Sequence, residues 1–217
     1  MNINLLLKTY IFKGLSPREV DEALDYLSGR EVRYKKGEML ILPGDSISEF
    51  GIILSGTVQI SCDDINGNRM IMTTVSQGDL FGESLAATGA QDSPICATAA
   101  EDVTVLWLRA QPIRELRTKT PLQAKIVSNF ISAIAHKCLS MNDRVQILSK
   151  KTIREKVITY LSQLAEHKRR TEFTLPLDRQ DMANYLGVER SALSRELSKM
   201  AAEGIIEYHK NSFRILK

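Results

Sequence analysis

The chain has 217 residues, 43% of them hydrophobic and 25% charged, a balance that suits one or two domains with ordinary buried cores. No apolar run is long enough for a membrane span, and no secretory signal is expected because the start lacks a basic leader and a small-residue cleavage site. Residues 150–217 carry 14 Lys and Arg against 9 Asp and Glu, a net of +5, whereas residues 1–149 carry 15 against 17, a net of −2. A basic C-terminal third fits a nucleic-acid partner.

The cysteines Cys62, Cys96 and Cys138 are widely spaced, which indicates neither a disulfide scaffold nor a CxxC metal site. A reduced, cytoplasmic protein is expected. No nucleophile–base constellation, metal cluster or phosphate-binding loop is visible in the sequence, so we do not expect an enzyme.

The first thirty residues are predicted to be helical. Ser16-Pro17-Arg18-Glu19 is a capping box with proline at the first helical position. The buried side of this helix is expected to be Val20, Ala23, Leu24 and Leu27. Its role is packing.

From Glu31 to Leu108, short apolar runs alternate with glycine-containing turns. Asn66-Gly67, between two alternating runs, is a strong hairpin signal. Many short strands with regular turns predict a sandwich or barrel, and we expect a double-stranded β-helix, or jelly roll. The candidate strands are Met39–Leu42, Phe50–Leu54, Val58–Cys62, Arg69–Val75, Cys96–Ala99 and Val103–Leu108.

One segment of this region is a candidate ligand site. Gly82 is followed by Glu83 and Ser84, and the segment continues to Ser93 and Pro94. Backbone N–H groups and these side chains could hold a sugar or a phosphate; a structural turn is the competing interpretation.

A long uninterrupted helix follows, with Thr120 as its expected N-cap and Pro121 at its first position. Its apolar residues recur in alternating steps of three and four, which is typical of a coiled-coil seam. We predict a parallel coiled-coil dimer; the competing interpretation is the central helix of a monomeric core. The seam is Ala124, Val127, Ile131, Ile134, Cys138, Met141, Val145 and Leu148, with Val127, Ile131, Ile134, Cys138, Met141 and Val145 as the expected dimer contacts. A second set, expected to pack on the β domain, is Leu122, Ile126, Phe130 and Ala133.

Thr152 to Glu166 is predicted to form another amphipathic helix. Its expected inward side chains are Ile153, Val157, Tyr160, Leu161 and Leu164. The basic stretch 167–171 is predicted to be a loop, which could contact DNA phosphates or a partner protein, or could simply be a solvated turn.

Asp178 to Met200 is predicted to form two short helices joined by a tight turn. Asp178 can cap the first helix, and Gly187 ends it where a left-handed residue is needed. Val188 is expected to be a buried anchor. The second helix has an apolar stripe at Leu193, Leu197 and Met200 and a polar face at Arg190, Ser191, Ser194 and Arg195. Arginine can bond the guanine edge and serine can reach bases or phosphates, so this face is predicted to read DNA; a helix pair with solvated arginines is the competing interpretation.

Short strands are expected around this helix pair, at Phe173–Pro176, Ile205–His209 and Phe213–Leu216, with a turn at 210–212. Together they describe a winged helix. The predicted fold class is α+β: an N-terminal double-stranded β-helix in residues 1–119, a long dimerisation helix in 120–149, and a C-terminal winged helix-turn-helix in 150–217.

This order of elements resembles the CRP/FNR superfamily of bacterial transcription regulators. The resemblance lies in GEMLILPGDSISEFGIILSGTVQI (37–60), GDLFGES (78–84) and LDRQDMANYLGVERSALSREL (177–197). It implies a homodimer that binds a palindromic DNA operator, works with RNA polymerase, and controls DNA binding through a signal sensed by the β-roll. The alternative is a cyclic-nucleotide-like sensor module without direct DNA binding.

The resemblance also implies an effector site, in which Gly82 and Glu83 match a ribose-contacting pair. The Arg-Ser pair that holds a cyclic phosphate is replaced by Ser93 and Pro94, so cyclic AMP is not expected. An iron–sulfur cluster is not expected either, because no cysteine precedes Cys62 and a cluster takes four. The cofactor therefore stays unassigned.

At the DNA end, the resemblance places Arg179 and Gln180 at phosphate contacts. Arg190 and Arg195 match recognition-helix arginines, whereas Ser191 replaces a family glutamate and Glu189 stands before Arg190. The operator half-site is therefore expected to differ from the family's standard one.

Overall fold

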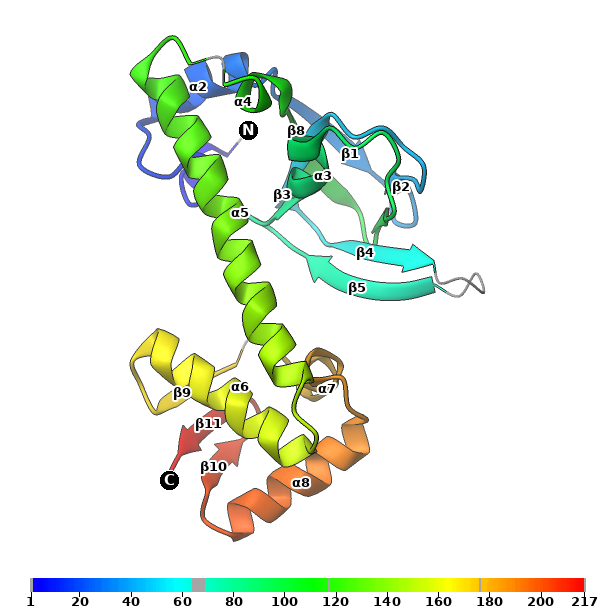
Figure 1. Ribbon diagram of the computed structural model, residues 1–217, viewed down its shortest axis with the longest axis vertical. Coiled ribbons are helices and arrows are strands. Elements are labelled where there is room, and N and C mark those ends of the chain that lie inside the picture. The colour runs from blue at the N-terminus through cyan, green and yellow to red at the C-terminus, as the bar shows by residue number, and fades with distance from the viewer. Residues whose placement is uncertain (1, 64–68, 117, 176, 217) are drawn as a thin grey trace. The chain divides into compact units, whose positions relative to one another are not determined.

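The computed structural model (Figure 1) describes residues 2–63, 69–116, 118–175 and 177–216. The chain divides into two compact units, Met1–Ala135 and His136–Lys217. The division falls inside the long helix α5 (Pro121–Leu148), so the limits of the three domains expected from the sequence remain a prediction. Among the described residues, no helix combines the length and the apolar character that a membrane crossing needs.

Two helices, α1 (Ile3–Leu6) and α2 (Pro17–Tyr26), open the first unit. The predicted capping box of α2 is present: the Glu19 backbone N–H donates to the Ser16 hydroxyl at 3.3 Å, and the Ser16 N–H donates to the Glu19 carboxylate at 2.7 Å. These hydrogen bonds from Ser16, the backbone one first, lower the pKa of Glu19. The predicted buried side is confirmed for Val20, Ala23, Leu24 and Leu27.

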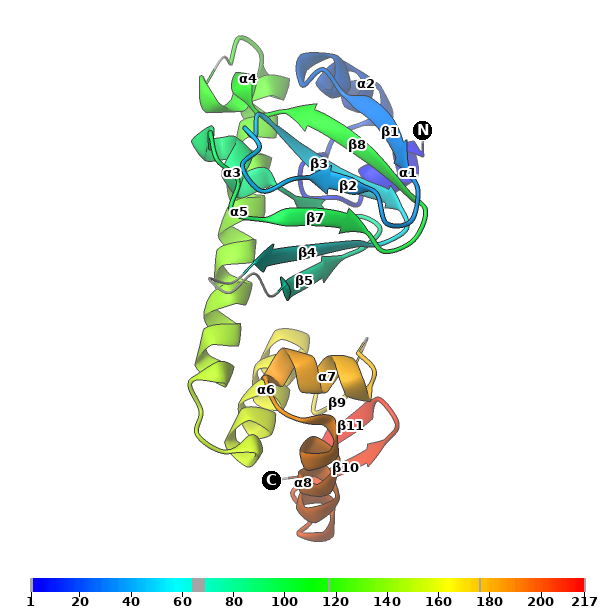
Figure 2. The same ribbon diagram turned by 90° about the vertical axis from the view of Figure 1, so that its right-hand side faces the viewer.

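Two antiparallel sheets form the body of the first unit (Figure 2). Their strand orders are β1-β8-β3-β6 and β2-β7-β4-β5. The strands are β1 (Arg30–Tyr34), β2 (Met39–Ile41), β3 (Glu49–Ser55), β4 (Val58–Asp63), β5 (Arg69–Val75), β6 (Leu80–Phe81), β7 (Cys96–Ala99) and β8 (Val103–Arg109). The double-stranded β-helix is thus confirmed. The predicted Asn66-Gly67 turn lies outside the described residues, although the strands on either side of it, β4 and β5, pair antiparallel.

Two strands were not predicted from the sequence. β1 reads Arg-Glu-Val-Arg-Tyr and is exposed or half-buried along its length, so it lacks an apolar run. β6 has two residues and joins the sheet only through Gly51 and Ile52 of β3. Both strands therefore form because they pair with neighbouring strands, and not because their own residues have a strong β-propensity.

The inner face of the β1-β8-β3-β6 sheet is packed tightly around Trp107. The Trp107 indole meets the Phe81 ring edge-on, with 5.2 Å between ring centroids. A Cβ atom on Gly51 would lie 2.3 Å from the Phe81 ring and 2.9 Å from Val105. Only glycine leaves room at this position, because real side-chain contacts do not approach so closely.

Helix α5 begins as predicted, since the Thr120 hydroxyl accepts from the Gln123 backbone N–H at 3.3 Å. In the first unit its packing face lies on the β-roll, where the rings of Phe130 and Phe50 have centroids 5.0 Å apart. Asn129 donates to the backbone carbonyls of the segment before α2. The predicted packing set is confirmed, with Ile126, Phe130 and Ala133 buried and Leu122 partly buried. Two short helices complete this unit: α3 (Glu83–Thr88) and α4 (Gln111–Arg114).

The second unit is a winged helix. Its elements are α6 (Ile153–Lys168), β9 (Glu172–Thr174), α7 (Arg179–Leu186), α8 (Arg190–Ala202), β10 (Ile206–His209) and β11 (Ser212–Ile215). The strands form an antiparallel sheet in the order β10-β11-β9. Ile147 of α5 joins the buried core of this unit. The winged helix-turn-helix predicted from the sequence is therefore confirmed.

Two local predictions in this unit need correction. α6 continues to Lys168, and Arg169 ends it in a left-handed conformation with φ +51°, so the predicted basic loop begins two residues later than expected. The helix extends because its apolar face keeps packing through Leu164 and Ala165. Val188 is half-buried and packs against the edge of the core, where a fully buried anchor was expected.

Candidate DNA interface and effector pocket

The two helices of the helix-turn-helix are fixed by caps that the sequence predicts. The Asp178 carboxylate accepts from the Asp181 backbone N–H at 2.8 Å, at the start of α7. Gly187 ends α7 with φ +61°, and the Lys156 ammonium donates to the Leu186 carbonyl at 3.1 Å. The predicted apolar sides of α7 and α8 are buried: Met182, Ala183, Leu186, Leu193, Leu197 and Met200. α8 is thus held by one face, and its other face is exposed.

An ion-pair cluster anchors α8 to α6. The Arg154 guanidinium donates to Glu196 at 2.6 Å and to both carboxylate oxygens of Glu203 at 2.7 and 3.0 Å. The hydrogen bond from Arg154 is the largest cause that lowers the pKa of Glu203. Forked donation by arginine fixes orientation as well as distance, so the cluster sets the rotation of α8 about its axis.

Arg190 and Arg195 lie on the exposed face of α8. Neither guanidinium makes a hydrogen bond or ion pair with a residue that the structure describes. Two uncommitted cations on a rigid helix can form bidentate hydrogen bonds with base edges or contact phosphate.

Ser191 and Ser194, which were also predicted to face DNA, are placed differently. The Ser191 hydroxyl donates to the carboxylate of Glu189, the N-cap of α8. This hydrogen bond is the largest cause that lowers the pKa of Glu189, and the charge of Arg195 lowers it further. Ser194 is half-buried. The exposed face at the start of α8 therefore carries the Glu189 carboxylate, hydrogen-bonded to Ser191, in addition to the Arg190 and Arg195 cations.

Arg179 and Gln180, the predicted phosphate contacts, lie in the first turn of α7. Gln180 is exposed and donates to Asn184 at 3.1 Å. The Arg179 guanidinium stacks on the rings of Tyr208 and Phe213, 5.3 and 5.5 Å from their centroids, and donates to the Lys210 carbonyl at 2.9 Å. Burial lowers the pKa of Arg179. Arg179 thus also ties α7 to the wing, a role that the sequence did not reveal.

Arg179→Lys and Arg179→Ala separate these two roles. Both should lower thermal stability, since each removes the planar stack, worth about 0.5–2 kcal/mol for a cation on aromatic faces. Only Arg179→Ala should flatten the salt dependence of DNA affinity, by about one unit of slope per protomer, because lysine keeps the charge. Thermal unfolding and a salt series with specific and scrambled duplexes measure both effects. A change of base preference in Arg179→Ala would contradict the phosphate assignment.

The predicted seam of α5 is exposed over much of its length. Ile131, Met141 and Val145 expose 59%, 61% and 63% of their surface, and Cys138 is exposed. Leu139 and Leu148, at 60% and 41%, add to this apolar surface. Large apolar side chains gathered on one solvated helix indicate an interaction surface.

Two of the expected dimer contacts differ from the rest. Val127 is 8% exposed and belongs to the core of its own unit, so it is not an exposed seam residue. Ile134 is half-buried and packs on the same core. The three–four spacing marks a buried face but does not say which neighbour covers it, and near its start α5 is covered by its own β-roll.

The predicted effector residues lie at the start of α3 and in the turn before β7. Gly82 adopts φ +73° as the N-cap of α3, Glu83 is 2% exposed, and Ser84 and Pro94 are exposed. The Ser93 hydroxyl donates to the Ile95 carbonyl at 3.1 Å and accepts from the Ile95 N–H, and Ser93 is 1% exposed. Ser93 therefore holds its own turn in place.

Cyclic AMP is expected not to bind at micromolar concentration. Ser93 and Pro94 supply no cation for a cyclic phosphate, and loss of a charged hydrogen-bond partner costs about 1.5–3 kcal/mol. Isothermal titration calorimetry of the purified protein with cyclic AMP is the direct measurement. A micromolar dissociation constant would contradict this expectation.

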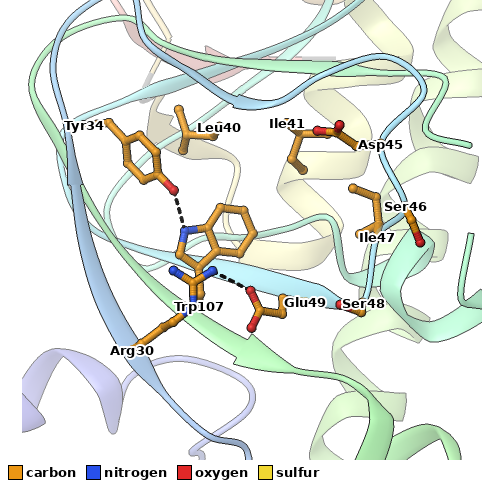
Figure 3. Close-up of a pocket in the computed structure, with 10 residues that line it drawn as sticks. All are labelled: Arg30, Tyr34, Leu40, Ile41, Asp45, Ser46, Ile47, Ser48, Glu49 and Trp107. Carbon is orange, nitrogen blue, oxygen red and sulfur yellow. Dashed lines mark hydrogen bonds and ion pairs between the residues drawn. The ribbon is translucent and has the colours of Figure 1, made fainter. Parts of the chain in front are cut away.

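A cavity of about 200 Å³ lies beside this segment, on the inner face of the roll (Figure 3). Its wall includes Arg30 and Tyr34 of β1, Trp107 of β8, and the stretch from Asp45 to Glu49 before and at the start of β3. A Cβ on Gly82 would lie 3.5 Å from Ile41, another wall residue, so the predicted segment backs onto this cavity. The sequence analysis missed these side chains because β1 was not predicted and because the cavity joins residues far apart in the chain.

Within the described part of the chain, no group of three or more His, Cys, Asp and Glu side chains is arranged to hold a metal ion. Cys62 is half-buried, Cys96 buried and Cys138 exposed, and all three are free thiols.

Each of the two units matches a known protein family. Residues 31–120 match the cyclic nucleotide-binding domain, and residues 155–217 match the Crp-like helix-turn-helix domain. The cyclic AMP receptor protein of Thermus thermophilus is 27% identical over 197 residues, which cover 90% of this chain and 87% of that protein. The transcriptional activator protein FnrL of Cereibacter sphaeroides is 25% identical over 182 residues, covering 80% and 71% of the two chains. A structure of CprK complexed with OCPA has the same fold, with a TM-score of 0.65, 19% identity, and coverage of 92% of this chain and 91% of that one.

A β-roll joined to a winged helix whose recognition helix presents two uncommitted arginines defines a DNA-binding transcription regulator. With both domains matched in this order, the chain belongs to the CRP/FNR superfamily, whose members form dimers and bind DNA.

Proposed function

We propose that this chain is a homodimer that binds a palindromic operator and that a signal sensed by its β-roll controls DNA binding. The main support is the exposed face of α8, where Arg190 and Arg195 make no hydrogen bond or ion pair with any residue that the structure describes, while Arg154 holds the helix through Glu196 and Glu203. A rigid helix with unengaged guanidinium groups is what recognition in the major groove requires.

The dimer would pair the exposed seam at Ile131, Cys138, Met141 and Val145 of two copies. Two-fold symmetry would then bring two α8 helices to successive major grooves, about 34 Å apart. We propose that Arg190 and Arg195 read bases, that Gln180 and the remaining N–H groups of Arg179 contact phosphate, and that Glu189, held over Ser191, accepts from a cytosine amino group. This arrangement differs from the family pattern, so a non-standard half-site is expected.

Selection from a random duplex library tests this function. The purified full-length chain should enrich an inverted repeat whose half-sites are about 10 base pairs apart, centre to centre. Enrichment of a single asymmetric half-site would contradict the dimer, and no enrichment over an unrelated protein of similar charge would contradict specific binding. A sensor module without direct DNA binding, the alternative function, predicts this last result and is not favoured by the Crp-like helix-turn-helix match.

We further propose RNA polymerase as a protein partner and the cytoplasm as the location. Support for the first comes from the relative named a transcriptional activator, and support for the second comes from the DNA target and the three free thiols.

A further inference from the structure

The cavity in the β-roll is divided into a side with donors and a side with carboxylates (Figure 3). Arg30 and Tyr34, both from β1, lie on one side, and Asp45 and Glu49 lie on the other. In this view the indole of Trp107 lies above the contact between Arg30 and Glu49 and is hydrogen-bonded to Tyr34. Such a division orients a ligand with opposite charges at its two ends, because each end meets its complement on one side only.

An ion pair joins the two sides of the cavity. Arg30 donates to Glu49 at 2.6 Å, and the Arg109 guanidinium lies 3.9 Å from the other Glu49 oxygen. The side chain of Glu49 is 22% exposed and that of Arg30 is 53% exposed. Glu49 is therefore the more shielded charge, and it is the more costly one to leave without a partner.

Further hydrogen-bonding capacity is available in the wall. The Trp107 indole N–H donates to the Tyr34 oxygen at 2.9 Å, so the Tyr34 hydroxyl proton remains for an acceptor, and no described residue takes it. One oxygen of Asp45 accepts from the Leu42 N–H at 2.7 Å, which leaves the other. Trp107 and the aliphatic side chains Leu40, Ile41 and Ile47 supply apolar surface.

These groups discriminate between ligand charges. A simple anion that took the Arg30 nitrogen now bonded to Glu49 would leave this shielded carboxylate without its close partner. A simple amine that bound Glu49 in place of Arg30 would likewise leave the Arg30 guanidinium without its close partner. A molecule with both an ammonium and a carboxylate replaces both halves of the ion pair, so no charge is left unmatched.

We propose that this cavity binds an α-amino acid as the effector of the β-roll. The proposal rests on the proposed function for its regulatory meaning. The carboxylate meets Arg30 and the Tyr34 hydroxyl, the ammonium meets Glu49 and Asp45, and the side chain lies on Trp107. The volume of about 200 Å³ is below the roughly 300–1,000 Å³ of pockets for drug-sized ligands, which suits a small metabolite.

The cavity is connected to the long helix through adjacent residues of β3. Glu49 faces the cavity, and the next residue, Phe50, faces the other way and packs on Phe130 of α5 at 5.0 Å between ring centroids. Side chains alternate along a strand, so a shift of β3 at Glu49 also moves Phe50. Exchange of the Arg30–Glu49 ion pair for a ligand therefore acts on the helix that bears the seam.

Trp107, the one tryptophan of the chain, provides the readout. Each of the twenty standard L-amino acids is titrated into the full-length protein, with intrinsic tryptophan fluorescence for detection and calorimetry for confirmation. The best ligand is then compared with its decarboxylated amine and its deaminated acid. The variants are Arg30→Gln and Glu49→Gln, with Asp102→Asn as the matched control because it breaks the exposed Lys35–Asp102 ion pair of the same unit, outside the cavity.

At least one amino acid should bind the wild-type protein and Asp102→Asn equally. Both cavity variants and both analogues should bind about tenfold to a hundredfold more weakly, as expected for the loss of one charged hydrogen-bond partner. Binding by none of the twenty, equal binding by the deaminated acid, or equal binding by Glu49→Gln would overturn the proposal. Operator selection with ligand-free protein tests the proposed function separately, so specific DNA binding without amino-acid binding would overturn only the ligand assignment.

Discussion

Ile131→Glu is expected to leave the protein monomeric at micromolar concentration and to abolish specific DNA binding. Ile131 is 59% exposed, so the substitution does not disturb the core of its own unit. In the proposed dimer the two glutamates would be buried opposite each other, and an uncompensated buried charge costs about 3–5 kcal/mol. That corresponds to a dimer roughly a hundredfold or more weaker. Sedimentation velocity measures the assembly, and a gel shift with the selected operator measures binding.

The matched control is Ser132→Glu, which adds the same charge one residue further along α5. Ser132 is exposed and lies off the seam, so this variant should remain dimeric and bind DNA. Ile134 is a poorer choice for the seam substitution, because it packs on its own β-roll and a glutamate there would also destabilise the fold. A dimeric Ile131→Glu protein, with Ser132→Glu behaving identically, would contradict pairing along this seam.

Arg195→Ala is expected to weaken operator binding and to relax the preference at one base pair of each half-site. Each half-site should lose about 1–3 kcal/mol of discrimination, the usual contribution of a bidentate contact between arginine and guanine. Because the proposed dimer has two α8 helices, the loss of binding free energy on a palindromic operator is twice the loss at one half-site. Repeating the duplex selection with the variant shows the altered position, and quantitative binding to the original operator gives the free energy.

Lys199→Ala is the control for charge alone. Lys199 is exposed one turn further along α8, so its removal subtracts the same charge from the same helix. It should reduce affinity for all duplexes without changing base preference. If Lys199→Ala relaxes the operator sequence as much as Arg195→Ala does, the reading face of α8 is assigned wrongly.

The winged helix could be predicted from sequence because its signals are local. Asp178, Gly187 and the spacing of Leu193, Leu197 and Met200 each act within a few residues, and the structure has the caps and the buried stripe that they imply. The strands of the β-roll that are buried on both faces were also visible as apolar runs. β1 was not, because its charged residues are held by pairing with β8 and by partners elsewhere in the fold.

The cavity and the role of Arg179 could not be read from the sequence for a related reason. Arg30 and Glu49 are 19 positions apart and Tyr34 and Trp107 are 73 apart, so only the register of the sheet brings them together. Arg179 matches a phosphate contact by position, but its stacking on Tyr208 and Phe213 depends on the wing folding back onto α7. The predicted site residues themselves remain to be tested by the variants above.

The middle of helix α5 is exposed, so hydrogen exchange of its backbone amides reports whether the protein is a monomer or a dimer. Phe130 is buried in one unit and Ile147 in the other, whereas every residue from 135 to 142 is exposed. In a single chain, these exposed residues gain little from packing, and helical hydrogen bonds open readily where packing is weak. Amide hydrogen exchange at 135–142 should therefore be fast in monomeric Ile131→Glu and slow in the wild-type dimer, while the amides near Phe130 and Ile147 stay protected in both.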